Sequence, residues 1–302
     1  AGTVEIFGKD VTGLRPDQIQ NLGLTRTFQH TRLWRQMTVI ENLLVPPRGQ
    51  FGSSFSDRIK ALLAPKSNQQ ESDRLEKAYS VLNQLEVPHM AHNLTSELSG
   101  GQSKLVDIGR SMMGDPRLLL LDEPVAGVAG PLAMKIFNNL RDIVDETGIS
   151  ILIIEHNMDF ILRQGVDRII VMNEGRVVPQ DTPWEIYRHP TNSWVASFVG
   201  EVNQISGVAS GETAETSIGT VNLCNAAHGA VDVIVRPEEL MLVDGNDSLI
   251  TRIDYFGHDT VYEITTSTGV ELRCRTGGSP LHQVGDRVDV RHSGLTTVSF
   301  PR

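Results

Sequence analysis

The sequence predicts an α/β domain followed by a small all-β domain. Two runs of consecutive apolar residues, Leu118–Leu121 and Ile151–Ile154, are separated by a segment with helical periodicity. Strands that follow one another through a helix form a mostly parallel sheet. Beyond about residue 200 the pattern changes to short alternating stretches with frequent glycines. We therefore expect one domain at 1–200 and a second at 203–302.

The helix expected between the two core strands begins near Pro131 and ends at Thr147, directly before Gly148. Proline in the first turn and glycine just past the last turn are the usual start and stop signals of a helix. Its predicted apolar face consists of Leu132, Ile136, Leu140 and Ile143. The two strands are apolar throughout rather than alternating, which predicts a sheet that is buried on both faces.

A helical subdomain, inserted into this α/β core, is expected at about residues 37–95. It opens with Thr38 and Glu41, which have the three-residue spacing of a capping box. The charged, glutamine-rich stretch 67–86 has the period of an amphipathic surface helix.

The C-terminal region is expected to be a small barrel or sandwich. Apolar and charged residues alternate in 270–275 and 288–291, and Gly269 and Gly285 supply turns. The polar stretch 209–219 is expected to be flexible. No residue of this region is a candidate ligand, and His258 is interpreted as a turn residue rather than as a metal ligand.

The composition limits the possible classes of function. The chain has 302 residues and a formal charge of −10, which argues against a broad nucleic-acid-binding surface. Its two cysteines, Cys224 and Cys274, suggest neither a disulfide scaffold nor a zinc ribbon. This low cysteine content is consistent with a protein of a reducing compartment. The sequence contains no run of 18 apolar residues and no leader pattern, so membrane association is expected to come through a partner.

The most informative local pattern is Ser99-Gly100-Gly101-Gln102. Serine at an N-cap with glutamine three residues later is a capping box ahead of an amphipathic helix. The two glycines allow a ligand or a second backbone to approach closely, and the positive end of the helix favours an anion. An ordinary capped helix has the same pattern, so this stretch alone leaves both interpretations open.

Polar residues follow both core strands. Asp122 and Glu123 end the first strand at its carboxyl end, which is where α/β sheets bind ligands. An aspartate there suits Mg²⁺ through water, and a neighbouring glutamate is suited to orient or deprotonate an attacking water. His156 follows the second strand and is a candidate for hydrogen bonding to a γ-phosphate. The alternatives are an acid pair that caps the next turn and a structural histidine.

Taken together, these residues resemble the motifs of the ATP-binding-cassette (ABC) ATPases. Gln29, the Ser99–Gln102 signature, Asp122 with Glu123, and His156 occur in the family's order, and the resemblance covers about residues 1–200. It implies a P-loop NTPase-type core with ATP and Mg²⁺ as cofactors. Glu123 would be the general base and His156 its catalytic partner on the γ-phosphate side. The residues implied in nucleotide binding are Gln29, Ser99, Gly100, Gly101, Gln102 and Asp122, with Gln29 and Asp122 also close to the metal.

The resemblance to importers points in two directions. The stretches 23–45, 122–128 and 151–161 resemble the ATPase subunits of branched-chain amino acid importers, which predicts a subunit that couples ATP hydrolysis to amino acid transport. The C-terminal stretches 233–242, 254–264 and 284–292 resemble the transport-associated OB (TOBE) domain of ferric-iron, polyamine and sugar importers. This resemblance implies an OB-like C-terminal domain, and these importers remain alternatives.

One family motif is not found in these residues. ABC ATPases carry Gly-x-x-x-x-Gly-Lys-[Ser/Thr], the Walker A motif, whose backbone amides and lysine hold the phosphates. The nearest candidate, from Gly2 to Asp10, has one residue too many between its glycines and an acid where a hydroxyl is needed. We therefore expect that the chain begins just after the Walker A helix and that, alone, it binds ATP poorly and is inactive.

The resemblance also implies partners. Two such domains close over ATP, so Ser99, Gly100 and Gly101 would serve ATP held by a second ABC ATPase subunit, in a homo- or heterodimer. Transmembrane permease subunits, and indirectly a solute-binding protein, would place the chain at the cytoplasmic face of the cell membrane. Ala129 stands where the family usually has Asp or Asn. The alternative is a non-hydrolysing regulatory subunit that supplies only the signature in trans. A DNA-repair or chromosome ATPase would have long heptad arms and a basic surface, which this sequence lacks.

Overall fold

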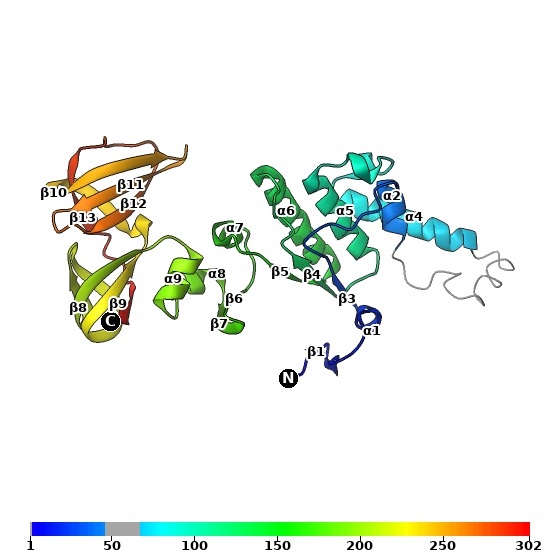
Figure 1. Ribbon diagram of the computed structural model, residues 1–302, viewed down its shortest axis with the longest axis horizontal. Helices are drawn as coiled ribbons and strands as arrows, with labels where there is room; N and C mark the ends of the chain where they lie inside the picture. The colour runs from blue at the N-terminus through cyan, green and yellow to red at the C-terminus, as the bar shows by residue number, and fades with distance from the viewer. Residues whose placement is uncertain (1, 46–66) are drawn as a thin grey trace. The chain divides into compact units, whose positions relative to one another are not determined.

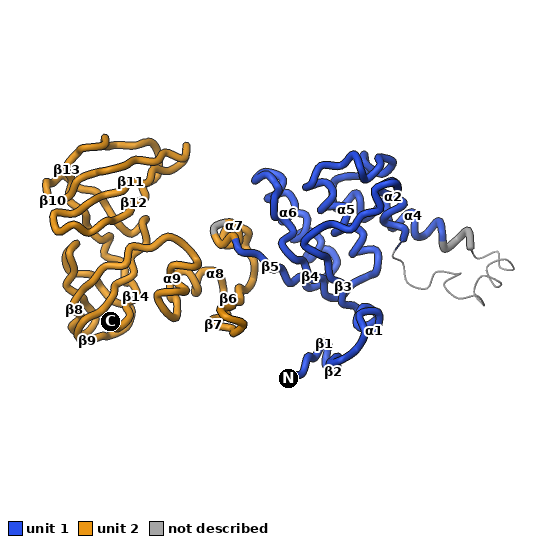
Figure 2. The backbone as a smooth tube through the Cα atoms, in the orientation of Figure 1, with its two compact units in different colours: residues 1–156 blue, residues 157–302 orange. Residues whose placement is uncertain are grey.

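The computed structural model describes residues 2–45 and 67–302 and forms two compact units, 1–156 and 157–302 (Figure 2). The part of the predicted helical subdomain at 46–66 lies outside the described residues. Residues 157–199 group with the C-terminal strands. The predicted domain boundary near residues 200–203 therefore stays a prediction.

The first unit consists of short strands, helices and one parallel sheet (Figure 1). Its elements are β1 (Glu5–Ile6), β2 (Lys9–Asp10), α1 (Pro16–Asn21), β3 (Leu24–Arg26), α2 (Val39–Leu44), α4 (Ser67–Gln84), the 3₁₀ turns η1 (Pro88–Met90) and η2 (Thr95–Glu97), α5 (Gly100–Met112), β4 (Leu118–Asp122), α6 (Gly130–Thr147) and β5 (Ser150–Ile154). The sheet has the order β3-β4-β5, with Leu120 of β4 aligned between Arg26 and Leu152.

Helices cover one face of this sheet. The core includes Leu119 and Leu121 of β4, which are 0% and 1% exposed, together with buried side chains of α2, α4, α5 and α6. On the opposite face, Leu152 and Ile154 of β5 are 47% and 57% exposed. The prediction of two buried faces is therefore wrong for the described residues, because the helices that pack on the sheet all lie on its other side.

The predicted helix signals are confirmed in this unit. Thr38 and Glu41 form the capping box of α2, and the amphipathic stretch forms α4. Helix α6 starts one residue before Pro131, and Gly148 ends it with a left-handed φ of 69°. Three of the four predicted apolar positions of α6 are fully buried in the core, and Leu132 packs against it.

The second unit begins with short helices and a two-stranded sheet and continues as an all-β body. Its elements are α7 (Met158–Arg163), β6 (Ile169–Asn173), β7 (Arg176–Asp181), α8 (Pro183–Arg188), α9 (Ser193–Val199), β8 (Asn203–Thr216), β9 (Gly219–Val235), the 3₁₀ turn η3 (Pro237–Glu239), β10 (Leu240–Tyr255), β11 (Asp259–Thr266), β12 (Glu271–Gly277), β13 (Arg287–His292) and β14 (Val298–Pro301). None of the helices in the described ranges is long and apolar enough to cross a membrane.

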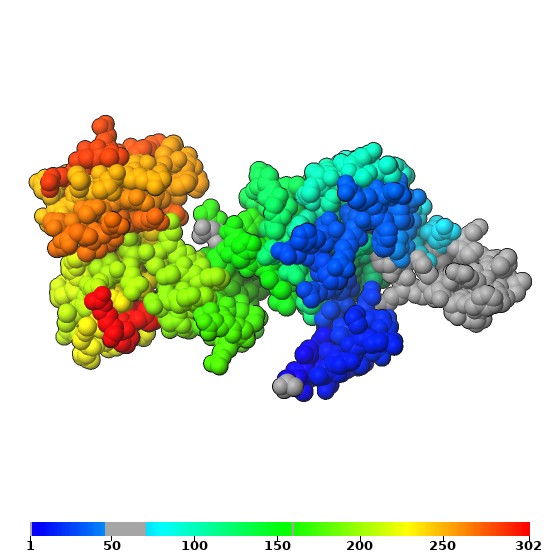
Figure 3. All heavy atoms as spheres, in the orientation of Figure 1, coloured from blue at the N-terminus to red at the C-terminus, as the bar shows by residue number. Residues whose placement is uncertain are grey.

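Two antiparallel sheets make the C-terminal body, as the alternating pattern predicts. Their orders are β12-β11-β10-β13 and β14-β9-β8, and one buried cluster that includes Ile205, Tyr262 and Cys274 draws on both. In the space-filling view the two sheets form a continuous body (Figure 3). The stretch 209–219, predicted to be flexible, instead forms the end of β8 and the turn into β9, because Ala214 is 1% exposed and packs in this core.

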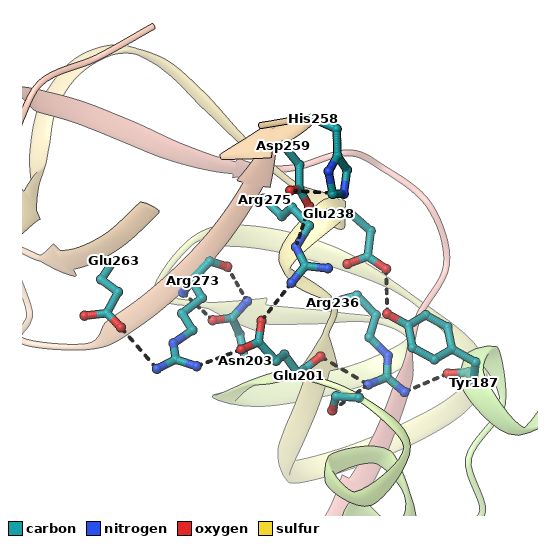
Figure 4. A network of polar contacts seen from close by, with 11 residues as sticks. Tyr187, Glu201, Asn203, Arg236, Glu238, His258, Asp259, Glu263, Arg273 and Arg275 are labelled. Atoms are coloured by element: carbon teal, nitrogen blue, oxygen red, sulfur yellow. Dashed lines mark hydrogen bonds and ion pairs between the residues drawn. The ribbon is translucent and has the colours of Figure 1, made fainter. Parts of the chain in front are cut away.

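A buried arginine joins helices α8 and α9 to the strands. Arg236 is 3% exposed, and its guanidinium donates to the carbonyl oxygens of Ala196 at 2.9 Å and Gly200 at 3.1 Å. It also donates to the carbonyl oxygen of Tyr187 at 2.8 Å (Figure 4). The guanidinium also lies 4.0 Å from the centre of the Tyr187 ring. Because the last carbonyls of a helix lack partners within that helix, this arginine caps α9 and holds it against the sheet.

Candidate functional site

The parallel sheet brings the predicted site residues to one edge. Asp122 is the last residue of β4 and pairs with Ile154, the last residue of β5. Gln29 follows β3, and His156 follows β5. Because the carboxyl ends of parallel strands lie at the same edge, residues from three separate parts of the sequence meet there.

Glu123 is the centre of this group. Its side-chain Oε2 accepts a hydrogen bond from Nε2 of Gln29 at 2.8 Å, and its Oε1 lies 3.3 Å from Nδ1 of His156. Its backbone N–H donates to the carbonyl of Ile154 at 3.0 Å. The carboxylate is thus in contact with both residues predicted on the γ-phosphate side.

The backbone of Glu123 has an unusual conformation. Its φ of 47° lies in the left-handed region, which costs a residue with a side chain free energy and is common at functional sites. The neighbouring contacts must offset this cost.

A lysine that the sequence interpretation missed holds the Glu123 backbone. Nζ of Lys104, in α5, donates to the carbonyl oxygen of Glu123 at 2.6 Å and to that of Gln29 at 3.3 Å. Burial lowers the pKa of Lys104, while nearby carboxylates, with Glu155 the strongest, oppose that shift. No local pattern in the sequence singles out Lys104, because its two partners lie 75 and 19 positions away along the chain.

Asp122 is engaged by a second residue that was not predicted. Nη2 of Arg26 donates to Oδ2 of Asp122 at 2.9 Å, and the two side chains are 54% and 23% exposed. Glu155, between β5 and His156, accepts from the backbone of Val125 at 3.4 Å, and burial raises its pKa. The edge therefore carries three carboxylates with different surroundings.

The Ser99 motif forms the predicted capping box. Oγ of Ser99 accepts from the backbone of Gln102 at 3.3 Å, and Oε1 of Gln102 accepts from the backbone of Ser99 at 2.9 Å. A Cβ at Gly100 would meet nothing within 4 Å, whereas one at Gly101 would collide with Leu132 of α6. Gly101 thus serves helix packing, and only Gly100 leaves open space at the helix start.

The structure does not bring this motif into hydrogen-bonding contact with the Glu123 group. Within residues 2–45 and 67–302, no hydrogen bond joins Ser99 or Gln102 to Gln29, Asp122, Glu123 or His156. Lys104, two residues beyond Gln102, provides the connection through α5. The candidate site therefore has two parts. One is the N-terminal end of α5 with the Ser99 motif, and the other is the carboxyl edge of the sheet with the Glu123 group.

Oxygen ligands suit Mg²⁺, and the carboxylate of Asp122 and the amide oxygen of Gln29 supply this chemistry at the sheet edge. In the described part of the chain there is no group of three or more His, Cys, Asp or Glu side chains that could hold a metal by themselves. The donor set therefore fits a Mg²⁺ ion that keeps water and phosphate oxygens as its other ligands.

Comparison with family models matches two regions of the chain. Residues 1–126 match the model described as ABC transporter, and residues 233–293 match the model described as TOBE domain. The second region runs from β9 to the first residue of the loop after β13.

Two of the curated relatives match different lengths of this chain. A probable branched-chain amino acid transport ATP-binding protein of Methanocaldococcus jannaschii is 38% identical over 179 residues, which are 59% of this chain and 67% of that protein. A spermidine/putrescine import ATP-binding protein of Borreliella afzelii is 31% identical over 299 residues, which are 96% of this chain and 79% of that protein.

Solved structures resemble the chain over two thirds of its length. A nucleotide-free ATP-binding cassette from an ABC transporter has a TM-score of 0.53 and 36% identity, covering 67% of this chain and 78% of that one. An ADP form of an ATP-binding cassette of an ABC transporter has a TM-score of 0.52 and 34% identity, with the same coverage.

Proposed function

Because this chain belongs to the ATP-binding proteins of ABC transporters, we propose that it is the ATPase subunit of an importer and couples ATP hydrolysis to solute uptake. The observation that carries this proposal is the contact of one carboxylate, Glu123, with Gln29 and His156 at the carboxyl edge of the sheet. This is where an attacking water would need a base and its orienting partners.

In this proposal each residue at the edge has a distinct role. Bound MgATP supplies the phosphoryl group that is transferred to water. Glu123 takes the proton of the attacking water, and His156 and Gln29 orient the reacting groups. Asp122 would hold Mg²⁺, and the 2.9 Å contact between Arg26 and the Asp122 carboxylate would have to open for this. Competition between Arg26 and Mg²⁺ for one carboxylate follows directly from this arrangement.

Nucleotide binding is proposed to need a second subunit. The 302 residues contain no Walker A motif, so hydrolysis at Glu123 is proposed to need a phosphate-binding motif that these residues do not supply, and the 302 residues alone are expected to be inactive. The open space at Gly100 and the free end of α5 support binding of a nucleotide held by another ABC ATPase subunit, in a homo- or heterodimer, with Ser99, Gly100 and Gln102 facing it. Permease subunits and a solute-binding protein complete the proposed importer at the cytoplasmic face of the membrane.

For the transported solute we propose an amino acid of the branched-chain type. Relatives named for branched-chain amino acid transport have the higher identity over a shorter match, 38% over 179 residues and 36% over 189 residues. Relatives named for spermidine and putrescine import match more of the chain, including its C-terminal strands, at lower identity. Uptake of labelled leucine and labelled spermidine by cells with and without the chain distinguishes these solutes.

The ATPase proposal is tested on the transporter assembled from the natural protein and its partners. Glu123→Gln is expected to lower ATP hydrolysis by about two orders of magnitude or more, because it removes the general base. Glu146→Gln is the matched control, since Glu146 lies on α6 and bonds only Gln84 in the contacts described. Both variants should bind the permease equally in a pull-down.

Two outcomes would change the assignment. If Glu123→Gln hydrolyses ATP as fast as Glu146→Gln, while Ser99→Arg abolishes hydrolysis, the chain is a regulatory subunit that supplies its signature in trans. If the 302-residue chain alone hydrolyses ATP in a manner that depends on Glu123, the proposed need for a phosphate-holding partner is wrong.

A further inference from the structure

A cavity in the C-terminal β body belongs to the second unit, whereas the residues of the candidate ATPase site belong to the first. It has a volume of about 220 Å³ and is bordered by the β8–β9 turn, the bend in β10, the β11–β12 turn and β13. A dry cavity of ~150 Å³ holds benzene, and drug-sized ligands occupy ~300 Å³ or more. The cavity is therefore the right size for a small metabolite.

One carboxylate in the cavity is fixed by the backbone. The pairing of β10 with β13 shifts register between Asp244 and Ser248. The bulge directs the N–H groups of Asn246 and Asp247 at Oδ1 of Asp289, at 2.9 Å and 3.1 Å. Bulges that re-aim side chains are common next to binding sites.

The same bulge depends on a glycine. A Cβ at Gly245 would collide with the carboxylate of Asp289, so only glycine leaves this side chain in its place. With Oδ1 held by two amides, Oδ2 has no hydrogen-bond partner among the residues the structure describes. Asp289 is thus a preorganised acceptor with one oxygen available.

Charges of both signs line the cavity without neutralising each other. Arg291 lies two residues beyond Asp289 on the same side of β13, since Val288 and Val290 alternate with them and are buried. No ion pair of Asp247, Asp289 or Arg291 is found within the described ranges. Hydroxyl groups of Ser217, Ser248 and Ser267 add donors and acceptors around them.

This lining selects for one class of ligand. Two carboxylates repel a phosphate or other anion, and Arg291 disfavours a diamine. The lining includes no aromatic side chain, so a nucleobase or a sugar ring has nothing to stack on. A small molecule with one ammonium and one carboxylate matches all three charges.

We propose that this cavity binds a free α-amino acid with a small polar side chain, its ammonium at Asp247 and Asp289 and its carboxylate at Arg291. Each contact would be a charge-assisted hydrogen bond, and the serine hydroxyls bond the side chain. The site is independent of the proposed ATPase function and of the transported solute.

The test is a titration of the 302-residue chain with three probes, followed by NMR shifts of the lining residues and by calorimetry. L-serine carries both charges, ethanolamine lacks the carboxylate and 3-hydroxypropanoate lacks the ammonium. L-serine is expected to bind at least about tenfold more tightly than either of the others. Asp247→Asn, Arg291→Gln and Gly245→Ala should each weaken L-serine binding by about tenfold or more.

Gly245→Ala is the sharpest variant because it keeps every charge and only displaces Asp289. Glu212→Gln in β8 and Arg176→Gln in β7 change the same charges outside the cavity lining and should bind L-serine like the original chain. The proposal is overturned if L-serine leaves the lining residues unshifted at concentrations up to about 50 mM, which excludes even a weak site. It is also overturned if ethanolamine or 3-hydroxypropanoate binds as well as L-serine, or if Gly245→Ala binds L-serine unchanged while its thermal unfolding matches that of the original chain.

Discussion

Single residues at the sheet edge are held by contacts from distant parts of the chain. Glu123 has a left-handed φ of 47° and contacts Gln29, His156, Ile154 and Lys104. Since each of its polar groups has a partner in the described structure, the conformation is stabilised from several sides. Lys104 bonds the backbone of both Glu123 and Gln29.

Replacing this lysine should affect both stability and catalysis. Lys104→Met leaves two carbonyl oxygens without their shared donor, so we expect a loss of about 1–2 kcal/mol in the free energy of unfolding. In the assembled transporter kcat should fall, because Glu123 and Gln29 lose their common support. Chemical denaturation and steady-state ATPase assays measure the two effects.

Lys135→Met is the control for this change. Lys135 pairs with Glu86 at 2.8 Å, and the two side chains are 41% and 63% exposed. Exposed pairs contribute little, so its unfolding free energy should change by less than about 0.5 kcal/mol. If Lys104→Met and Lys135→Met have equal stability and equal kcat, Lys104 does not support the Glu123 group.

His292, at the end of β13, should make the stability of the second unit depend on pH. Burial lowers its pKa below the ordinary 6.5, Glu239 opposes the shift and Arg188 adds to it. The folded state thus prefers the neutral ring. The stability this provides is complete above pH 6.5 and is lost as the pH falls through 6.5 toward the lower pKa of the folded state.

His292→Gln should therefore flatten the dependence of unfolding free energy on pH between about 7.5 and about 5.5. His228→Gln, in β9 at an exposed position, is the control and should keep the slope of the original chain. Thermal unfolding followed at several pH values measures this slope. An unchanged slope in His292→Gln would show that another group titrates.

At the scale of elements, helix α5 joins the two parts of the candidate site. It begins with the Ser99 capping box, carries Lys104 one turn later and packs on α6 through Gly101. The two adjacent glycines have different surroundings, since only Gly101 faces a neighbouring helix. The two consecutive glycines therefore have different structural roles.

Alanine substitutions at Gly101 and Gly100 are expected to affect stability differently. Gly101→Ala should destabilise the chain by about 1–3 kcal/mol, because its Cβ overlaps the side chain of Leu132 in a packed interface. Gly100→Ala meets open space and, at the first position of α5, should be neutral or slightly stabilising. Denaturant titrations compare the two. If both variants lose the same stability, helix packing does not distinguish the glycines.

At the scale of the whole molecule, the described chain consists of two compact units. Arg236 explains why α8 and α9 belong to the second of them, because its guanidinium bonds the carbonyl oxygens of Tyr187 in α8 and Ala196 in α9. Burial lowers the pKa of Arg236 and raises the pKa of Tyr187, the ring beneath it. This cluster makes helices and strands one folding unit.

Arg236→Met should destabilise that unit by about 3 kcal/mol or more, because several buried carbonyl oxygens lose their donor together. Arg252→Met is the control, since Arg252 is 62% exposed and contacts Asp254 at 3.0 Å. Hydrogen exchange should show α9 opening earlier than the strands in Arg236→Met alone. Unchanged protection of α9 would refute its role as the cap of that helix.

The sequence by itself determined the features that depend on local pattern. The capping boxes at Thr38 and Ser99, the helix that ends at Gly148 and the alternating C-terminal strands follow from spacing of a few residues. The identities of Gln29, Asp122, Glu123 and His156 as site candidates also came from short motifs and their order.

Only the tertiary structure decided which distant groups meet. Lys104 bonds Gln29 across 75 positions, and Arg26 bonds Asp122 across 96, at separations where no periodicity links the residues. The one-sided burial of the sheet and the grouping of α8 and α9 with the strands likewise depend on how elements pack. Local conformational preferences depend on residues that are neighbours in the sequence. The partner of a charged side chain depends instead on which distant segments the fold brings together.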